Sequence, residues 1–463
     1  MRLLFASSEV YPFSKTGGLG DVLGALPAAL ARLGHDVMVM SPWYGSLRSA
    51  QPLWIGDIEV PFDGGECTAG VGTLEKDGVR LAFVGHEDFR RDRIYGYPDD
   101  VRRFCRFTRS VPQVADRLRF RPDVVHVHDW HGAYLPVVLR RGRHLPDGYQ
   151  DIPSVLTIHN AQYQGISEIE ETLRWLRLPH VLAHSAIARE GLANALRAGS
   201  SFAERITTVS PSYAGEILTE EFGHGLDDTF RGLSHKLTGI LNGIETSEWD
   251  PAHDRHLPAT YDAGDTSGKR LAKRELCELT GLDDTRPLLA VVSRLAEQKG
   301  VDVLLDAAID LVDQGWSLFV LGTGEEPLEA RILALSRTDG RIAATVDYDE
   351  GLAHLVYAAA DALAIPSRFE PCGLSQLIAM RYGTLPIARA TGGLRDTIEH
   401  GRTGFLFSRL EPSAIAASAG EALHHYGTQR WTTMMHAAMG QDFSWDRSAR
   451  RYEELYQSVT GEL

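Results

Sequence analysis

Two segments of this sequence place glycines where a helix should begin, a pattern that could bind a diphosphate. Lys15 stands beside Gly17 and Gly18, and a cation next to bare backbone amides suits a phosphate group. The hexapeptide at residues 16–21, Thr-Gly-Gly-Leu-Gly-Asp, returns at residues 391–396 as Thr-Gly-Gly-Leu-Arg-Asp. Either copy alone is typical of an ordinary glycine turn. Together they predict two helix N-termini that bind an anion.

Charged residues in the second half extend this hypothesis. Arg294 and Lys299 could converge on a diphosphate, although a solvated charged turn is an equally good interpretation of that segment alone. Glu370 lies in a Pro- and Gly-containing segment where packing does not explain a carboxylate, and it could accept hydrogen bonds from sugar hydroxyls. Cys372 has no placed base nearby, so we interpret it as a packed thiol.

Histidines form a third group. His126 and His128 alternate along a predicted strand and would share one face, which raises the possibility of a zinc site. No matching set of ligands at metal spacing accompanies them, so packed histidines are the favoured interpretation. His159 and Asn160 follow the next strand and indicate a polar ligand.

The elements that must position these residues are parallel strands alternating with helices, which predicts an α/β protein with two doubly wound sheets. Helices are expected at 21–33, 301–314 and 445–458, the last with Tyr452, Leu455 and Tyr456 on its apolar side. In such sheets a ligand lies beyond the carboxyl ends of the strands, where the residues above occur. The expected strands are residues 2–7, 36–41, 81–84, 123–127, 154–159 and 205–210, then 288–293, 317–321, 341–346, 361–366 and 385–388.

The composition of the chain argues against several classes of protein. The 463 residues carry 47 Lys+Arg and 62 Asp+Glu, a net charge of −15, which argues against a protein that coats nucleic acid or an anionic membrane. The four cysteines have no disulfide-framework or zinc spacing, no apolar run reaches the roughly 20 residues of a membrane helix, and the first ten residues lack a signal-peptide core. We therefore expect a cytoplasmic protein.

Five motifs taken together resemble those of bacterial glycogen synthases and plant starch synthases. They are Lys-Thr-Gly-Gly-Leu-Gly-Asp-Val at 15–22, His-Val-His-Asp-Trp-His at 126–131, Asn-Gly-Ile-Glu at 242–245, Ser-Arg at 293–294 with Gln-Lys-Gly at 298–300, and Ser-Arg-Phe-Glu-Pro-Cys-Gly-Leu at 367–374. The resemblance implies the GT-B fold, with two Rossmann-like domains facing a deep cleft. Residues 1–241 would form the acceptor-side domain, completed by the helix 445–463, and residues 242–444 the domain that binds the nucleotide sugar.

The resemblance also implies an activity. Such enzymes transfer glucose from ADP-glucose to the non-reducing end of an α-1,4-glucan and release ADP, with retention of configuration and without a metal or other cofactor. The implied partners are therefore ADP-glucose and a glycogen or glucan primer, while the oligomeric state is left open. Alternatives are a related GT-B transferase that uses UDP-glucose or another acceptor, a metallohydrolase built on the histidines, and a non-catalytic glucan-binding protein.

Site residues follow from motif position. Lys15, the amides of Gly17 and Gly18, Arg294 and Lys299 would meet the diphosphate, and Glu370 would hold the glucose hydroxyls. The expected catalytic residues are Glu370, His159, Lys299, Arg294 and Asp129. The expected substrate-binding residues are Lys15, Gly17, Gly18, Asp21, Asn242, Cys372, Gly373, Leu374 and Ser375, with Tyr348 at the adenine and Glu9, Tyr95 and Tyr163 on the acceptor side.

Overall fold

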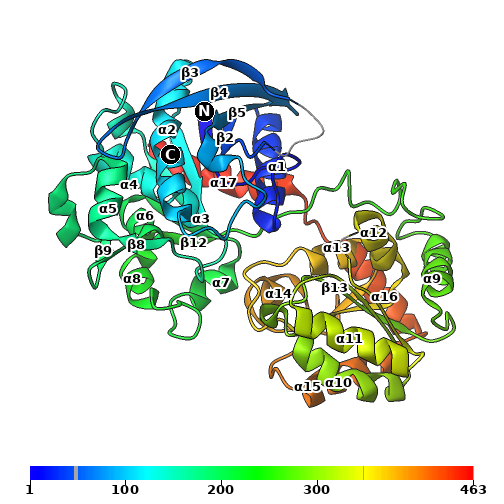
Figure 1. Ribbon diagram of the computed structural model, residues 1–463. Helices are drawn as coiled ribbons and strands as arrows, with labels where there is room; N and C mark the ends of the chain where they lie inside the picture. The colour runs from blue at the N-terminus through cyan, green and yellow to red at the C-terminus, as the bar shows by residue number, and fades with distance from the viewer. Residues whose placement is uncertain (46–50, 348, 462–463) are drawn as a thin grey trace. The chain divides into compact units, whose positions relative to one another are not determined.

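The computed structural model describes residues 1–45, 51–347 and 349–461, and the chain in it divides into two compact units (Figure 1). Unit 1 comprises Met1–Asn242 and Trp445–Leu463, and unit 2 comprises Gly243–Ser444. The division lies one residue beyond the boundary expected from sequence. Among the described residues, no helix is both long and apolar enough to cross a membrane.

Unit 1 is built on a sheet of nine strands in the order β12-β11-β7-β6-β1-β2-β5-β4-β3. Seven of them are parallel, and β3 and β4 join antiparallel at one edge. The strands are β1 (Arg2–Ala6), β2 (Asp36–Pro42), β3 (Leu53–Phe62), β4 (Gly65–Lys76), β5 (Val79–Gly85), β6 (Val124–His128), β7 (Ser154–Ile158), β11 (Arg205–Thr208) and β12 (Leu237–Gly239). A separate small antiparallel sheet contains β8 (Ile166–Glu168), β9 (Ala188–Arg189) and β10 (Leu192–Asn194).

The helices of unit 1 connect and cover these strands. They are α1 (Gly18–Arg32), α2 (Asp100–Arg117), α3 (Asp129–Gly132), α4 (Tyr134–Arg141), α5 (Ile169–Leu176), α6 (Ala195–Phe202), α7 (Pro211–Glu216), α8 (Asp227–Gly232) and α17 (Trp445–Thr460). Figure 1 shows α17, in red, among the blue and cyan elements of this unit. Its Tyr452 and Tyr456 are fully buried in the core formed with β1, β2 and α1, because its apolar residues recur at helical spacing.

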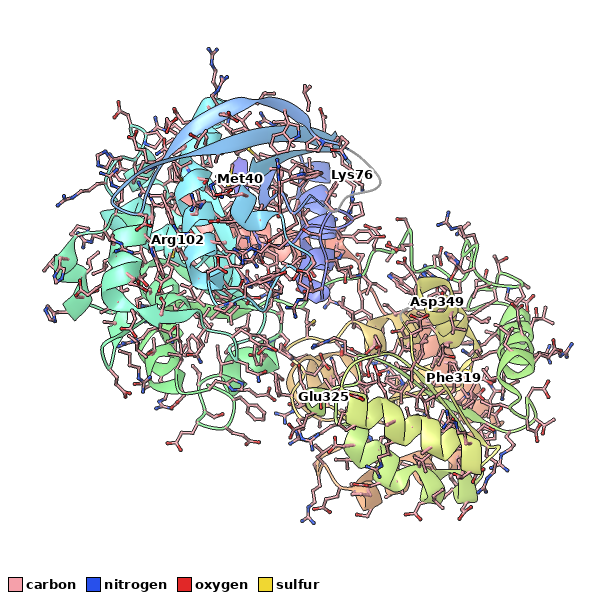
Figure 2. The ribbon with its side chains drawn as sticks, in the orientation of Figure 1. Met40, Lys76, Arg102, Phe319, Glu325 and Asp349 are labelled. Atoms are coloured by element: carbon pink, nitrogen blue, oxygen red, sulfur yellow. The ribbon has the colours of Figure 1, made fainter. Side chains whose placement is uncertain are left out.

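Unit 2 contains one sheet of six parallel strands in the order β15-β14-β13-β16-β17-β18. The strands are β13 (Leu288–Val292), β14 (Ser317–Leu321), β15 (Ile342–Thr345), β16 (Ala362–Ile365), β17 (Leu385–Arg389) and β18 (Phe405–Phe407). The helices are α9 (Ser267–Thr280), α10 (Val301–Gln314), α11 (Glu326–Thr338), α12 (Glu350–Ala359), α13 (Ser375–Arg381), α14 (Gly392–Thr397), α15 (Pro412–His425) and α16 (Gln429–Met439). Met40 of β2 and Phe319 of β14, both labelled in Figure 2, are buried within the two sheets.

The predicted α/β class with parallel sheets is confirmed, and every predicted strand is present within two residues at each end. The predicted start of the first helix was wrong. The helix begins at Gly18 rather than Asp21, because the extended Gly17 serves as its N-cap. Two hairpins escaped prediction although each carries the Asp-Gly turn signal. Asp63-Gly64 and Asp77-Gly78 have positive φ at both residues and connect β3, β4 and β5.

Candidate active site

Glu9, in the loop after β1, is a buried carboxylate that holds the glycine loop in place. Its side chain is 2% exposed. It accepts hydrogen bonds from the backbone N–H of Thr16 at 2.7 Å, from the Thr16 hydroxyl at 2.7 Å and from the Tyr95 hydroxyl at 2.7 Å. Such bonds to an ionised group are among the stronger ones in proteins. Glu9 and Tyr95 are therefore in direct contact, and the carboxylate fixes the loop between β1 and α1.

Lys15 and the start of α1 lie at the loop that Glu9 fixes. The Lys15 Nζ lies 2.6 Å from the Asp21 carboxylate, and each side chain keeps about a third of its surface exposed. No described atom lies within 4 Å of where a Cβ on Gly17 would be, so the backbone there is open on the side that a side chain would cover. The N–H groups of the first turn of a 15-residue helix thus stand beside a partly exposed ammonium group, an arrangement suited to an anion.

Four histidines lie in or next to β6 and β7, and we call them the histidine cluster: His126, His128 and His131, which are buried, and His159, which is partly buried. Both ring nitrogens of His126 have partners, the hydroxyl of Tyr456 in α17 at 2.7 Å and the hydroxyl of Thr157 at 2.6 Å. His128 Nδ1 lies 2.9 Å from His159 Nε2. Among the described residues, no group of three or more His, Cys, Asp or Glu side chains is arranged to hold a metal ion.

Burial keeps the histidine cluster neutral. It lowers the pKa of His126 to about 3, helped by the nearby His159, and it lowers the pKa of His159 to about 3 by itself. The pKa values of His128 and His131 also lie well below the ordinary value, chiefly because of burial. A neutral imidazole at position 159 can donate or accept a hydrogen bond but adds no positive charge to the site.

Asp129 is the first residue of α3 and directly follows β6. Its φ of +52° lies in the left-handed region that few side chains adopt. One carboxylate oxygen accepts the backbone N–H of His159 at 2.7 Å, so it orients the end of β7. Burial raises the pKa of Asp129 to about 7, against the opposing effect of its backbone hydrogen bonds. Asp129 and His159, predicted to belong to one site, therefore lie together.

In unit 2 the structure pairs Lys299 with Glu370. The two charges are 2.6 Å apart, and the Glu370 side chain is 7% exposed. The Ser367 hydroxyl donates to the same carboxylate oxygen at 2.8 Å. The loops that carry Lys299 and Glu370 can come this close only because residue 300 is glycine. A Cβ on Gly300 would lie 2.0 Å from the carbonyl oxygen of Pro366, and the φ of Gly300 is +65°. The loops after β13 and β16 therefore meet closely at the carboxyl edge of the sheet.

Arg294 differs from Lys299 in being exposed at the same edge. Among the described residues, its guanidinium has a single long contact, 3.4 Å, to the side chain of Gln298, so it can turn towards a ligand without breaking a buried network. The structure thus places one cation in a buried pair and the other in solvent.

The segment 372–375 is held by the second glycine repeat. A Cβ on Gly393 would lie 2.2 Å from the carbonyl oxygen of Cys372, so only glycine permits this contact. Gly373 has a φ of +74°, and α13 begins at Ser375 just after Leu374. Cys372 is buried, as expected for a packed thiol. Each Thr-Gly-Gly-Leu copy begins a helix, as predicted: α1 in unit 1 and α14 in unit 2.

Three further residues were predicted to bind substrate. Tyr163 is 55% exposed, and Asn242 is buried with no hydrogen-bond partner for its Oδ1 among the residues that the structure describes. Tyr348 lies outside the described residues. Sequence reasoning missed Thr16 and Ser367, whose hydroxyls hold the two carboxylates; their positions inside the motifs were the available signal.

Both units of the chain match known protein families. The family model of the starch synthase catalytic domain matches residues 2–232, and that of glycosyl transferases group 1 matches residues 273–432. Glycogen synthase of Thermus thermophilus is 43% identical over 463 residues, with all of both chains covered. Glycogen synthase of Deinococcus radiodurans is 45% identical over 466 residues, covering 99% of this chain and all of its own.

Solved structures agree with these matches. The catalytic domain of starch synthase IV from Arabidopsis thaliana, bound to ADP and acarbose, superposes with a TM-score of 0.92 at 33% identity and covers 99% of each chain. Sucrose-phosphate synthase from Thermosynechococcus elongatus shares the fold, with a TM-score of 0.65 at 16% identity and full coverage of both chains. Two units with parallel sheets and these matches define a glycosyltransferase of the GT-B fold. The chain belongs to the glycogen and starch synthase family.

Proposed function

We propose that this protein transfers glucose from ADP-glucose to the non-reducing end of an α-1,4-glucan, with retention of configuration and release of ADP. The observation that carries the proposal is the Lys299–Glu370 pair beside the exposed Arg294, in a chain 33% identical to a starch synthase bound to ADP and acarbose. A diphosphate needs cations, and a sugar needs a fixed hydrogen-bond acceptor. Unit 2 offers both at one sheet edge.

The reaction requires that charge be stabilised where it develops. As the bond between the anomeric carbon and the β-phosphate oxygen breaks, the diphosphate gains negative charge and the sugar becomes cationic. Lys299, Arg294, Lys15 and the amides at Gly17 and Gly18 are assigned to the diphosphate. Glu370 is assigned to the glucose hydroxyls, released from Lys299 as that cation turns towards phosphate.

Proton transfer completes the step. The departing β-phosphate oxygen takes the proton of the acceptor 4-hydroxyl while the new glycosidic bond forms on the same face of the sugar, so configuration is retained. Atoms balance without a protein nucleophile, a separate general acid or a metal ion. His159, neutral because burial lowers its pKa to about 3, is assigned to a sugar hydroxyl as a hydrogen-bonding group.

The test is transfer of labelled glucose to a glycogen primer, comparing ADP-glucose with UDP-glucose in the presence and absence of a chelator. We expect chelator-insensitive incorporation with ADP-glucose and a product that α-1,4-specific hydrolases release completely. A preference for UDP-glucose would replace the donor in the proposal. Absence of incorporation with either donor would refute it.

A further inference from the structure

A cavity of about 510 Å³ lies at the carboxyl end of β5 in unit 1, apart from the residues assigned above. Trp54 of β3 lines it together with Asp57, Thr68, His86, Glu87 and Arg90. The cavity has the size of a small-ligand site. Its wall combines one large aromatic ring with side chains that can donate or accept hydrogen bonds.

Trp54 is exposed, at 41% of its surface, although tryptophan is usually well buried. Its indole is held flat against the sheet by two glycines: a Cβ on Gly85 would lie 2.6 Å from the ring, and one on Gly70 would lie 3.1 Å from it. Trp43 packs edge-on against it, with ring centroids 6.1 Å apart. The ring is therefore a fixed platform with one side supported by the protein and part of its surface in solvent.

The charges around the cavity favour an uncharged ligand. Among the described lining residues, Asp57 and Glu87 oppose one cation, Arg90, so the wall does not attract a phosphate. Another cavity of unit 1, about 530 Å³, contrasts with it: Arg143, Arg174 and Arg177 line that one beside two glutamates, and no Trp, Tyr or Phe is among its described lining residues. A rigid aromatic face beside hydroxyl-binding groups matches a sugar ring, which has apolar C–H faces and a polar rim.

The cavity also lies on the sheet edge that carries the candidate acceptor residues. Strand β5 pairs with β2, and β2 pairs with β1, so the end of β5 is about 10 Å from the end of β1, which precedes Glu9. Trp43 connects the two places, since its N–H donates to Val84 and the following Tyr44 hydroxyl donates to the carbonyl of Ser8. One polymer chain is long enough to contact both.

We propose that the cavity around Trp54 is a second α-glucan-binding site, which retains the polymer by stacking a glucose ring on the indole. The proposal rests on the proposed function, because the ligand is the polymeric acceptor of that reaction. A second contact on the same polymer raises the local concentration of chain ends without taking part in transfer. It should therefore matter for glycogen and not for a short acceptor.

The test compares four variants of the full-length protein by affinity electrophoresis in gels containing glycogen: Trp54→Ala, Trp54→Phe, Asp57→Ala and Leu53→Ala. Leu53 is the matched control, since it is the adjacent residue of β3, is 70% exposed and does not line the cavity. We expect Trp54→Ala to raise the apparent Kd for glycogen about tenfold, the effect of losing a large aromatic anchor. Trp54→Phe and Asp57→Ala should have smaller effects, and Leu53→Ala should stay within about twofold.

Kinetics provides the second measurement. With maltotriose as acceptor, kcat and KM of Trp54→Ala should match the wild type, whereas KM for glycogen should rise. Unchanged glycogen binding in Trp54→Ala, an equal loss in Leu53→Ala, or an equal loss with maltotriose would each overturn the proposal. If Trp54→Ala unfolds, Asp57→Ala decides, because Asp57 is exposed and its loss leaves the fold intact. A wild type that binds glycogen through Trp54 but transfers no glucose would refute the proposed function alone.

Discussion

Replacing Lys299 should separate two roles of one side chain, a structural role towards Glu370 and a chemical role towards phosphate. At 2.6 Å and an effective dielectric constant of about 20, the attraction between the two charges is about 6 kcal/mol before desolvation is counted. Breaking a buried pair costs about 3–5 kcal/mol, because one charge stays buried alone. Lys299 is 20% exposed, so the lower end, about 3 kcal/mol, applies to Lys299→Met. In a unit of about 200 residues this lowers Tm by roughly 6–12 °C.

The double variant Lys299→Met, Glu370→Gln distinguishes these roles. The neutral amide can still accept the Ser367 hydroxyl, so we expect most of the lost stability to return, with a coupling energy of about 2 kcal/mol. Activity should not return. We expect kcat to fall by about a hundredfold or more in both variants, because the proposed role of Lys299 is to stabilise the charge of the diphosphate. Calorimetry and labelled transfer with ADP-glucose measure the two effects.

A second ion pair provides the matched control. Lys273 and Asp361 are 2.7 Å apart and similarly buried, but Asp361 precedes β16 and so lies at the opposite, amino edge of the sheet in unit 2. Lys273→Met should destabilise unit 2 by a similar amount and leave kcat unchanged at temperatures where the protein is folded. An unchanged Tm in Lys299→Met, or restored transfer in the double variant, would refute this account of Lys299.

Three further outcomes are expected. Glu9→Gln should lower kcat/KM for ADP-glucose roughly ten- to a hundredfold, since it disrupts the bonds that hold Thr16 in the glycine loop; an effect confined to the glucan KM would contradict this. Tyr456→Phe should cost unit 1 about 1 kcal/mol by removing the partner of His126, without changing transfer, and a loss of kcat would argue against a purely structural role. Stability of unit 1 should fall as pH drops from 6.5 towards 4, because the unfolded chain binds protons that the histidine cluster does not. Each extra proton that the unfolded chain binds lowers the free energy of unfolding by about 1.4 kcal/mol per pH unit. Asp129 offsets one of these protons, because its pKa of about 7 makes the folded state bind a proton over the same range. Equal unfolding free energies at pH 7 and pH 5 would contradict this.

The parallel sheets could be predicted because buried strands give continuous apolar runs of four to seven residues. The hairpin of β3 and β4 was not predicted because most of its residues are exposed or only partly buried and β4 is rich in glycine, which hides the pattern of a strand. The Asp-Gly turns that follow β3 and β4 could nevertheless be recognised in the sequence. The position of Trp54 could not be predicted for the same reason. Only the structure shows that its ring lies on two glycines from other strands rather than in a core.

The cations and glycines of the candidate site could be identified from the sequence, but the hydrogen bonds and ion pairs that they make could not. Lys299 and Glu370 are 71 residues apart, and their pairing depends on the close contact of Gly300 with Pro366, which neither motif reveals alone. Glu9 was expected to face the acceptor, yet its carboxylate is occupied by the loop of Thr16 and by Tyr95. Its assignment to the acceptor remains a prediction, to be tested against the positioning role that these bonds indicate.

Three carboxylates at strand ends share one feature that bears on the chemistry. Glu9 binds Thr16, Asp129 binds the backbone of His159, and Glu370 binds Lys299 and Ser367. A carboxylate held by several donors is a poor nucleophile, because attack would break those bonds before a new one forms. Each one instead positions a group suited to a ligand: helix amides, a neutral imidazole, or an ammonium ion that turns to the phosphate when the donor binds. In the proposed displacement the leaving phosphate itself accepts the proton, so the reaction needs these positioned groups and no protein nucleophile.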